Sequence, residues 1–162
     1  MRCMYEFRPM TADDLPLIQR WLGEPHVVRW WGKPDEQFDL VSGDLGQPAM
    51  SQFIVVRETR PFAYLQSYNP AAWDNGGLGP QPAGTRGIDQ FIGEADMLDR
   101  GHGSAFIRSF IDQLLTAGTP RVVTDPDPAN ARAIRAYEKA GFRRDRLVDT
   151  PDGRALLMVR NA

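Results

Sequence analysis

The feature that most constrains the fold is a long amphipathic helix that begins at a pair of glycines. Six apolar residues follow Gly101-His102-Gly103 at the spacing of one helix face, and they are Phe106, Ile107, Phe110, Ile111, Leu114 and Leu115. Gly118 and Pro120 end this helix. Strands are predicted on both sides of it, at Arg86–Ile92 and Arg121–Thr124. Because such a helix buries its apolar face on a sheet, the sequence predicts an α/β or α+β fold.

The remaining segments predict further helices and strands around the same sheet. Thr11 is a hydroxyl N-cap ahead of a helix that ends at Gly23, and a second helix is expected over residues 34–45. A further helix runs from about residue 129 to residue 140 and ends at Gly141. The other strands are expected at residues 5–7, 52–57 and 61–68, and on both sides of the turn at residues 151–153. This order predicts one domain, residues 1–162, with about four helices.

The composition excludes several classes of function. With 19 Lys and Arg against 21 Asp and Glu, the net charge is −2, so a nucleic-acid-binding surface is not expected. The only cysteine, Cys3, excludes an internal disulfide and a cysteine-based zinc site. His26 and His102 have no partners at metal-ligand spacing, so we expect no metal. Without a signal peptide or an 18-residue apolar run, the protein is expected to be cytoplasmic and off the membrane, as a monomer or a homodimer.

The glycine-rich turn before the long helix is a candidate phosphate site. Glycines in Arg100-Gly101-His102-Gly103-Ser104 let backbone amides face outward, and the helix N-terminus adds positive potential. The turn is neither a Walker A loop nor a dinucleotide fingerprint, because Phe106 stands where the third glycine belongs. A purely structural turn is the alternative.

A second segment supports a specific family. Asn130, Tyr137-Glu-Lys-Ala-Gly141 and Phe142 follow the glycine turn by about 30 residues, and together they resemble the GCN5-related N-acetyltransferase (GNAT) superfamily. The resemblance implies a single mixed, mostly antiparallel sheet with a splayed central strand pair, and acetyl-CoA as the acetyl donor. The donor-binding residues that it implies are Gln90, Phe91, Ile92, Leu98, Asp99, Arg100, Gly101, His102, Gly103, Ser104, Asn130 and Tyr137. Leu98 departs from the Gln or Arg that usually opens the phosphate loop.

Other segments along nearly the whole chain resemble aminoglycoside 6'-N-acetyltransferases. They are Trp30-Trp31-Gly32, Gln66-Ser67-Tyr68, Arg86-Gly-Ile-Asp-Gln90, Thr124-Asp125-Pro126 and Thr150-Pro-Asp-Gly153. This resemblance implies an acceptor pocket lined by aspartates and a tryptophan, here Trp30, Trp31, Tyr68, Asp74, Asp89 and Asp125. In one respect the chain departs from the family, because residues 75–88 carry no acidic side chain.

Catalytic roles are expected for two residues. Asp89 lies among apolar strand residues and could accept the proton of the attacking amine, although it could instead pair with Arg86. Tyr137 could protonate the departing thiolate, as in the superfamily, or simply pack in the core. Strand amides of residues 90–92 are expected to polarise the thioester carbonyl.

The remaining candidates have structural alternatives as well. Asp125 could serve the following helix as an N-terminal acid, and Asn130 could cap that helix. Residues 69–84 are interpreted as a substrate-side loop, the alternative being a disordered excursion. Trp30 and Trp31 are treated as an extended pair, of which one faces the core and the other is free for substrate.

The sequence therefore predicts an acetyl-CoA-dependent N-acetyltransferase that acts on a primary amine, with an aminoglycoside as the favoured acceptor. One alternative is another small amine or a hydroxylamine of the siderophore-precursor type, which the acid-poor loop at residues 75–84 favours. A non-catalytic module that binds CoA or amines on the same fold is the other alternative.

Overall fold

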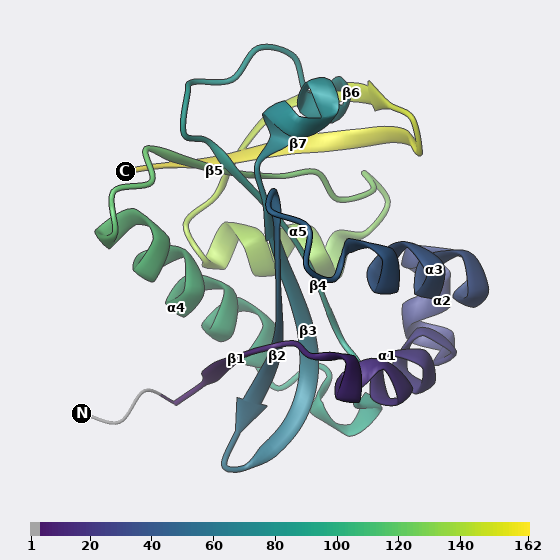
Figure 1. Cartoon of the computed structure of the whole chain (residues 1–162). Coiled ribbons are helices and arrows are strands. Elements are labelled where there is room, and N and C mark those ends of the chain that lie inside the picture. Colours follow the sequence, from purple (N-terminus) through teal and green to yellow (C-terminus); the bar gives the residue numbers. More distant parts are fainter. Residues whose placement is uncertain (1–3) are drawn as a thin grey trace. The chain divides into compact units, whose positions relative to one another are not determined.

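The computed structural model describes residues 4–162, so Cys3 lies outside the described residues. The strands are β1 (Glu6–Pro9), β2 (Met50–Arg57), β3 (Arg60–Tyr68), β4 (Arg86–Ile92), β5 (Arg121–Thr124), β6 (Arg143–Thr150) and β7 (Gly153–Asn161). The helices are α1 (Leu15–Leu22), α2 (Pro25–Trp31), α3 (Pro34–Asp44), α4 (His102–Thr116) and α5 (Ala131–Lys139), with short 3-10 segments η1 (Ala12–Asp14), η2 (Pro70–Gly77) and η3 (Ala95–Met97). Figure 1 labels these helices and strands. None of the described helices is long and apolar enough to cross a membrane.

The strands form one seven-stranded mixed sheet in the order β1-β2-β3-β4-β5-β7-β6. β4 and β5 are parallel, whereas β1 with β2, β5 with β7, and β6 with β7 are antiparallel. The chain divides into two compact units. The first contains the residues up to Gln66 and Gln90–Arg100, and the second contains Ser67–Asp89 and Gly101–Ala162.

The first unit packs three helices around a core that contains Trp21. In Figure 1, α1, α2 and α3 lie together, and their apolar side chains join those of β2 and β3. Trp21 is completely buried beside Gly93, where an added Cβ would come within 2.2 Å of the indole ring. Gly93 therefore allows the close contact between Trp21 and the backbone that follows β4.

Helix α2 corrects the sequence interpretation of Trp30 and Trp31 as an extended pair. Pro25 begins this helix in the position where a missing amide hydrogen costs nothing, and Gly32 ends it with a φ of 96°. Because successive residues on a helix point about 100° apart, the two tryptophans can still face different surroundings. Sequence reasoning missed α2 because its seven residues are too few for a clear helical period.

The second unit is built on an antiparallel β5-β7-β6 arrangement with α4 and α5 side by side (Figure 1). The Arg108 guanidinium of α4 donates a hydrogen bond to the Lys139 carbonyl of α5. The Arg160 guanidinium connects β7 to α4 through Asp112 at 2.6 Å. Leu78 packs with apolar side chains of β5, β6 and β7 in a small buried cluster. Its members are Leu78, Val123, Val148, Ala155, Leu157 and Val159.

The parallel ladder between β4 and β5 is short. It pairs Arg86 with Val122 and Gly87 with Val123, and β5 ends at Thr124 while β4 continues to Ile92. The Thr124 hydroxyl donates a hydrogen bond to the Ile88 carbonyl at 3.1 Å, so the strands stay together for one further residue. Polar side chains just beyond that point therefore lie where the two strands cease to pair.

Candidate active site

Two carboxylates lie side by side where β4 and β5 cease to pair. Continuing the register of Gly87 with Val123 by two residues brings Asp89 opposite Asp125, which follows directly after β5. The negative charge of Asp89 contributes to the shifted pKa of Asp125, as close neighbours should. Both residues come from the second unit, and the pairing of the two strands is what places them together.

The carboxyl group of Asp125 has a strongly raised pKa. Burial raises its pKa to about 8, and the charges of Asp89 and Asp152 act in the same direction. At neutral pH one proton is thus retained among neighbouring carboxylates. An incoming ammonium group would replace the repulsion between these carboxylates with attraction.

Asp152 was not among the predicted site residues. It lies in the turn between β6 and β7, and the Leu156 amide donates to the Pro126 carbonyl at 2.9 Å, which attaches β7 to the loop after Asp125. The sequence identified this turn as part of a family-like segment, but a hairpin turn carries no signal of what it packs against.

Tyr68 joins the carboxylates from the end of β3. Its ring lies against Gly87, where an added Cβ would be 2.3 Å from the Tyr68 Cζ and 2.7 Å from its hydroxyl oxygen. Burial raises the pKa of Tyr68 well above its usual range, and Asp89, Asp125 and Tyr137 add to the effect. The phenol therefore remains protonated at neutral pH.

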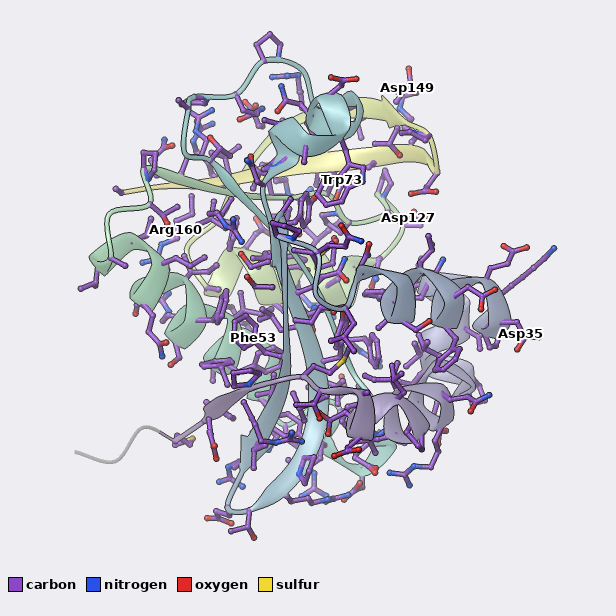
Figure 2. The ribbon with its side chains drawn as sticks, in the orientation of Figure 1. Asp35, Phe53, Trp73, Asp127, Asp149 and Arg160 are labelled. Carbon is purple, nitrogen blue, oxygen red and sulfur yellow. The ribbon has the colours of Figure 1, made fainter. Side chains whose placement is uncertain are left out.

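An exposed tryptophan lies next to Tyr68. The rings of Tyr68 and Trp73 meet edge to face at 89° with their centroids 5.9 Å apart, and Trp73 is 46% exposed. Figure 2 labels Trp73 on η2. Asp74, the next residue, is exposed on the same segment. Trp73 was not predicted as a site residue, although its presence in a glycine- and proline-rich loop was a usable signal.

Helix α5 supplies Asn130 and Tyr137. The Asn130 side chain accepts a hydrogen bond from the Ala133 amide at 3.2 Å, so it caps α5, as the structural alternative expected. Tyr137 is buried, packs edge to face on Phe142 at 5.5 Å, and lies near enough to Tyr68 to affect its pKa. The second unit thus brings together Tyr68, Asp89, Asp125 and Tyr137.

The turn before α4 contains two residues with left-handed backbone, a conformation that can turn backbone amides outward. Asp99 has a φ of 58° and Gly101 a φ of 79°, on either side of Arg100, and Gly101 is the N-cap of α4. An added Cβ on Gly101 would meet nothing within 4 Å, so the left-handed backbone is what requires a glycine there. His102, Gly103 and Ser104 form the first turn of α4, where amides lack helical partners. These residues suit a phosphate group.

The other predicted residues belong to the first unit. Trp31 packs edge to face on Phe91 at 5.0 Å and on Tyr64 at 6.2 Å, whereas Trp30 carries the Arg29 guanidinium 4.8 Å above its ring. Of the two tryptophans, Trp31 is therefore the one directed to the core.

The end of β4 and the start of the glycine turn also lie in this unit. Phe91 is a buried core residue, Gln90 and Ile92 are half-buried, and the Ile92 carbonyl bonds to the His26 Nε2 at 2.8 Å. Leu98 follows η3 as its C-cap and is half-buried, while Asp99 and Arg100 are exposed. Among residues 4–162, no group of three or more His, Cys, Asp or Glu side chains could hold a metal ion.

Comparison with known proteins identifies relatives of the chain. Residues 10–150 match the acetyltransferase (GNAT) domain family. The chain is 37% identical over 161 residues to aminoglycoside N(6')-acetyltransferase type 1 of Klebsiella pneumoniae, covering 94% of this chain and 80% of that protein. Its fold matches the structure of AAC(6')-Ib in complex with paromomycin and acetyl-CoA at a TM-score of 0.88 and 34% identity, covering 98% and 94% of the two chains. A more distant relative is N5-hydroxyornithine acetylase sidL of Beauveria bassiana, 27% identical over 86% of this chain and 26% of that protein.

Proposed function

The chain belongs to the GNAT acetyltransferase family, and from this premise we propose that it transfers the acetyl group of acetyl-CoA to the 6'-amine of an aminoglycoside. The observation that carries the acceptor class is the cluster of carboxylates around Asp125, whose pKa is raised by burial and by Asp89 and Asp152. Buried, mutually repelling carboxylates are stabilised by a ligand that carries several ammonium groups. Trp73 beside Tyr68 adds an exposed aromatic surface for a sugar ring.

The chain's own residues would take distinct roles in the reaction. Asp89 would accept the proton that the amine must lose before or during attack. Asp125 and Asp152 would hold further ammonium groups of the acceptor, with Asp74 at the rim. Tyr137 would supply a proton to the departing thiolate, and Tyr68 would act as a hydrogen-bond donor because its phenol stays protonated.

The turn at residues 98–104 would hold the pyrophosphate of acetyl-CoA, which supplies the activated acetyl group when bound. The left-handed backbone of Asp99 and Gly101 and the positive potential of the α4 N-terminus favour this placement. Leu98 provides no polar side chain there, so the contact that a Gln or Arg at this position usually makes would be absent, while the backbone amides would still bind the phosphates. Gln90, Phe91 and Ile92 would contribute backbone groups to the donor site.

A turnover screen tests the proposed acceptor. Acetyl-CoA consumption would be followed with kanamycin, paromomycin, spermidine, N-hydroxylated ornithine and a peptide N-terminus at equal concentrations. We expect the aminoglycosides to give the highest kcat/KM and mass spectrometry to place the acetyl group on the 6'-amine. Higher kcat/KM with N-hydroxylated ornithine than with any aminoglycoside would contradict the proposal.

A hydroxylamine acceptor is the second candidate, because the sidL relative is named for acetylation of hydroxyornithine. The acid-poor residues 75–88 agree with it, since a less cationic acceptor needs fewer carboxylates. Asp152 weakens this argument, because the hairpin between β6 and β7 provides a carboxylate that the loop lacks.

A further inference from the structure

The segment that carries Trp73 has a backbone that needs external support. Asp74 has a φ of 50° and Asn75 a φ of 60°, and Gly76 and Gly77 continue the left-handed run. Asp and Asn adopt this conformation more readily than other non-glycine residues, but a run of four left-handed residues is still uncommon. Such a backbone persists only when the surrounding structure holds it in place.

One side chain of the edge strand β6 holds the end of this segment. The Arg146 Nη2 donates a hydrogen bond to the Leu78 carbonyl at 2.6 Å, directly after η2. Asp145 accepts from the Arg146 Nη1 at 3.1 Å and so orients the guanidinium toward the segment. Gln81 makes only a longer contact with the same carbonyl, at 3.5 Å.

Glycines on either side of Leu78 leave room for this hydrogen bond and for the close approach of β6. An added Cβ on Gly79 would come within 2.7 Å of the Arg146 Nη2, and one on Gly77 within 2.5 Å of the Asp149 carbonyl oxygen. Leu78 is buried in the cluster with Val148 and Leu157, so its carbonyl has a defined position. Figure 2 labels Asp149 at the end of β6 and Trp73 on η2, the two structures that meet here.

From these contacts we propose that Arg146 is a positioning residue for acceptor binding. By holding the Leu78 carbonyl, it stabilises the left-handed run at residues 74–77 and keeps Trp73 against Tyr68, beside Asp89 and Asp125. The inference rests on the proposed function, because it assumes that the acceptor binds at these residues. In this role Arg146 acts through the Leu78 carbonyl.

The test compares Arg146→Ala and Arg146→Lys with Arg144→Ala as a matched control. Arg144 lies on the same strand, is 60% exposed, and pairs with Glu138 on α5. Kinetics with kanamycin and acetyl-CoA would be measured together with hydrogen exchange of the amides at residues 71–79. Because a hydrogen bond from a charged donor is lost at a half-exposed position, we expect Arg146→Ala to raise the KM for kanamycin about tenfold. The kcat and the KM for acetyl-CoA should change less than twofold.

Three further results are expected from the same set. Exchange at residues 71–79 should become faster in Arg146→Ala, Arg146→Lys should restore part of the kanamycin KM, and Arg144→Ala should match the wild type. An unchanged kanamycin KM together with unchanged exchange in Arg146→Ala would overturn the proposal, as would an equal effect of Arg144→Ala. If the wild type acetylates no aminoglycoside, the proposed function fails, and exchange alone then decides whether Arg146 holds the segment.

Discussion

At the scale of single residues, the two candidate catalytic groups should contribute unequally. Asp89→Asn keeps the shape of the side chain but cannot accept a proton, so we expect kcat to fall about 10²–10⁴-fold. Tyr137→Phe removes only a proton donor to a thiolate that can leave without one, so its loss should be smaller. Both variants would be measured at saturating acetyl-CoA from pH 6 to pH 9. The reverse order would show that Asp89 is not the base.

The raised pKa of Asp125 predicts a pH-dependent effect on stability. Between the usual aspartate value near 4 and the folded value of about 8, the folded protein retains a proton that the unfolded chain has lost. This group therefore lowers the free energy of unfolding as pH rises through that range. Asp125→Asn should be more stable than the wild type at pH 9, by up to about 5 kcal/mol, because each unit of the pKa rise corresponds to about 1.4 kcal/mol, and nearly equal to it at pH 4.

Urea denaturation at both pH values measures the difference, with Asp39→Asn on exposed α3 as the control. The control should show no gain that depends on pH. A constant difference between Asp125→Asn and the wild type from pH 4 to pH 9 would contradict the prediction.

At the scale of elements, the turn between β2 and β3 holds two non-glycine residues in a left-handed backbone that they adopt unfavourably. Glu58 and Thr59 have φ values of 49° and 68°, the left-handed pair that a two-residue hairpin turn requires and that glycine or asparagine adopts more readily. Thr59→Gly should raise the free energy of unfolding by about 1 kcal/mol, because a β-branched residue is strained there. Urea unfolding measures this, and Thr11→Gly, at an extended φ of −123°, should bring no gain.

The N-terminus of α4 provides a second prediction at this scale. Gly103→Val places a branched side chain in the first turn, where we propose that amides bind the pyrophosphate, so the Kd for acetyl-CoA should rise more than tenfold. Ala105→Val is the matched control. Ala105 is exposed and lies just after the proposed phosphate-binding turn, so this change should leave the Kd near its wild-type value. Calorimetric titration measures both constants. An unchanged Kd in Gly103→Val, with the protein still folded, would remove the phosphate assignment.

At the scale of the whole molecule, the charge balance makes acceptor binding sensitive to salt. The net charge is only −2, so attraction of a polycation depends on the local cluster of Asp74, Asp89, Asp125 and Asp152 rather than on the overall charge. The KM for kanamycin at saturating acetyl-CoA should therefore rise several-fold between 50 mM and 500 mM KCl. Asp74→Asn should reduce that rise. A KM that does not change with salt would favour the less cationic hydroxylamine acceptor.

Local sequence determined much of the fold and part of the site. The periodicity of residues 106–115, the Asn130 cap and the Gly141 stop define α4 and α5, because these signals act between residues close in the chain. The sequence placed Asp89 in one strand and Asp125 after another, and the family resemblance assigned both to one pocket. The pairing and register that bring them to one level are seen only in the structure.

Tertiary structure alone decided the remaining features. Three of these features join residues from separate elements. They are the effect of the Asp152 charge on the pKa of Asp125, the packing of Trp73 on Tyr68, and the packing of Trp31 on Phe91. The bond from Arg146 to Leu78 spans 68 residues of chain. Such contacts depend on how a hairpin or loop packs on the sheet, and no local propensity encodes that packing. The raised pKa of Asp125 has the same origin, because burial is a property of the folded chain rather than of the residue.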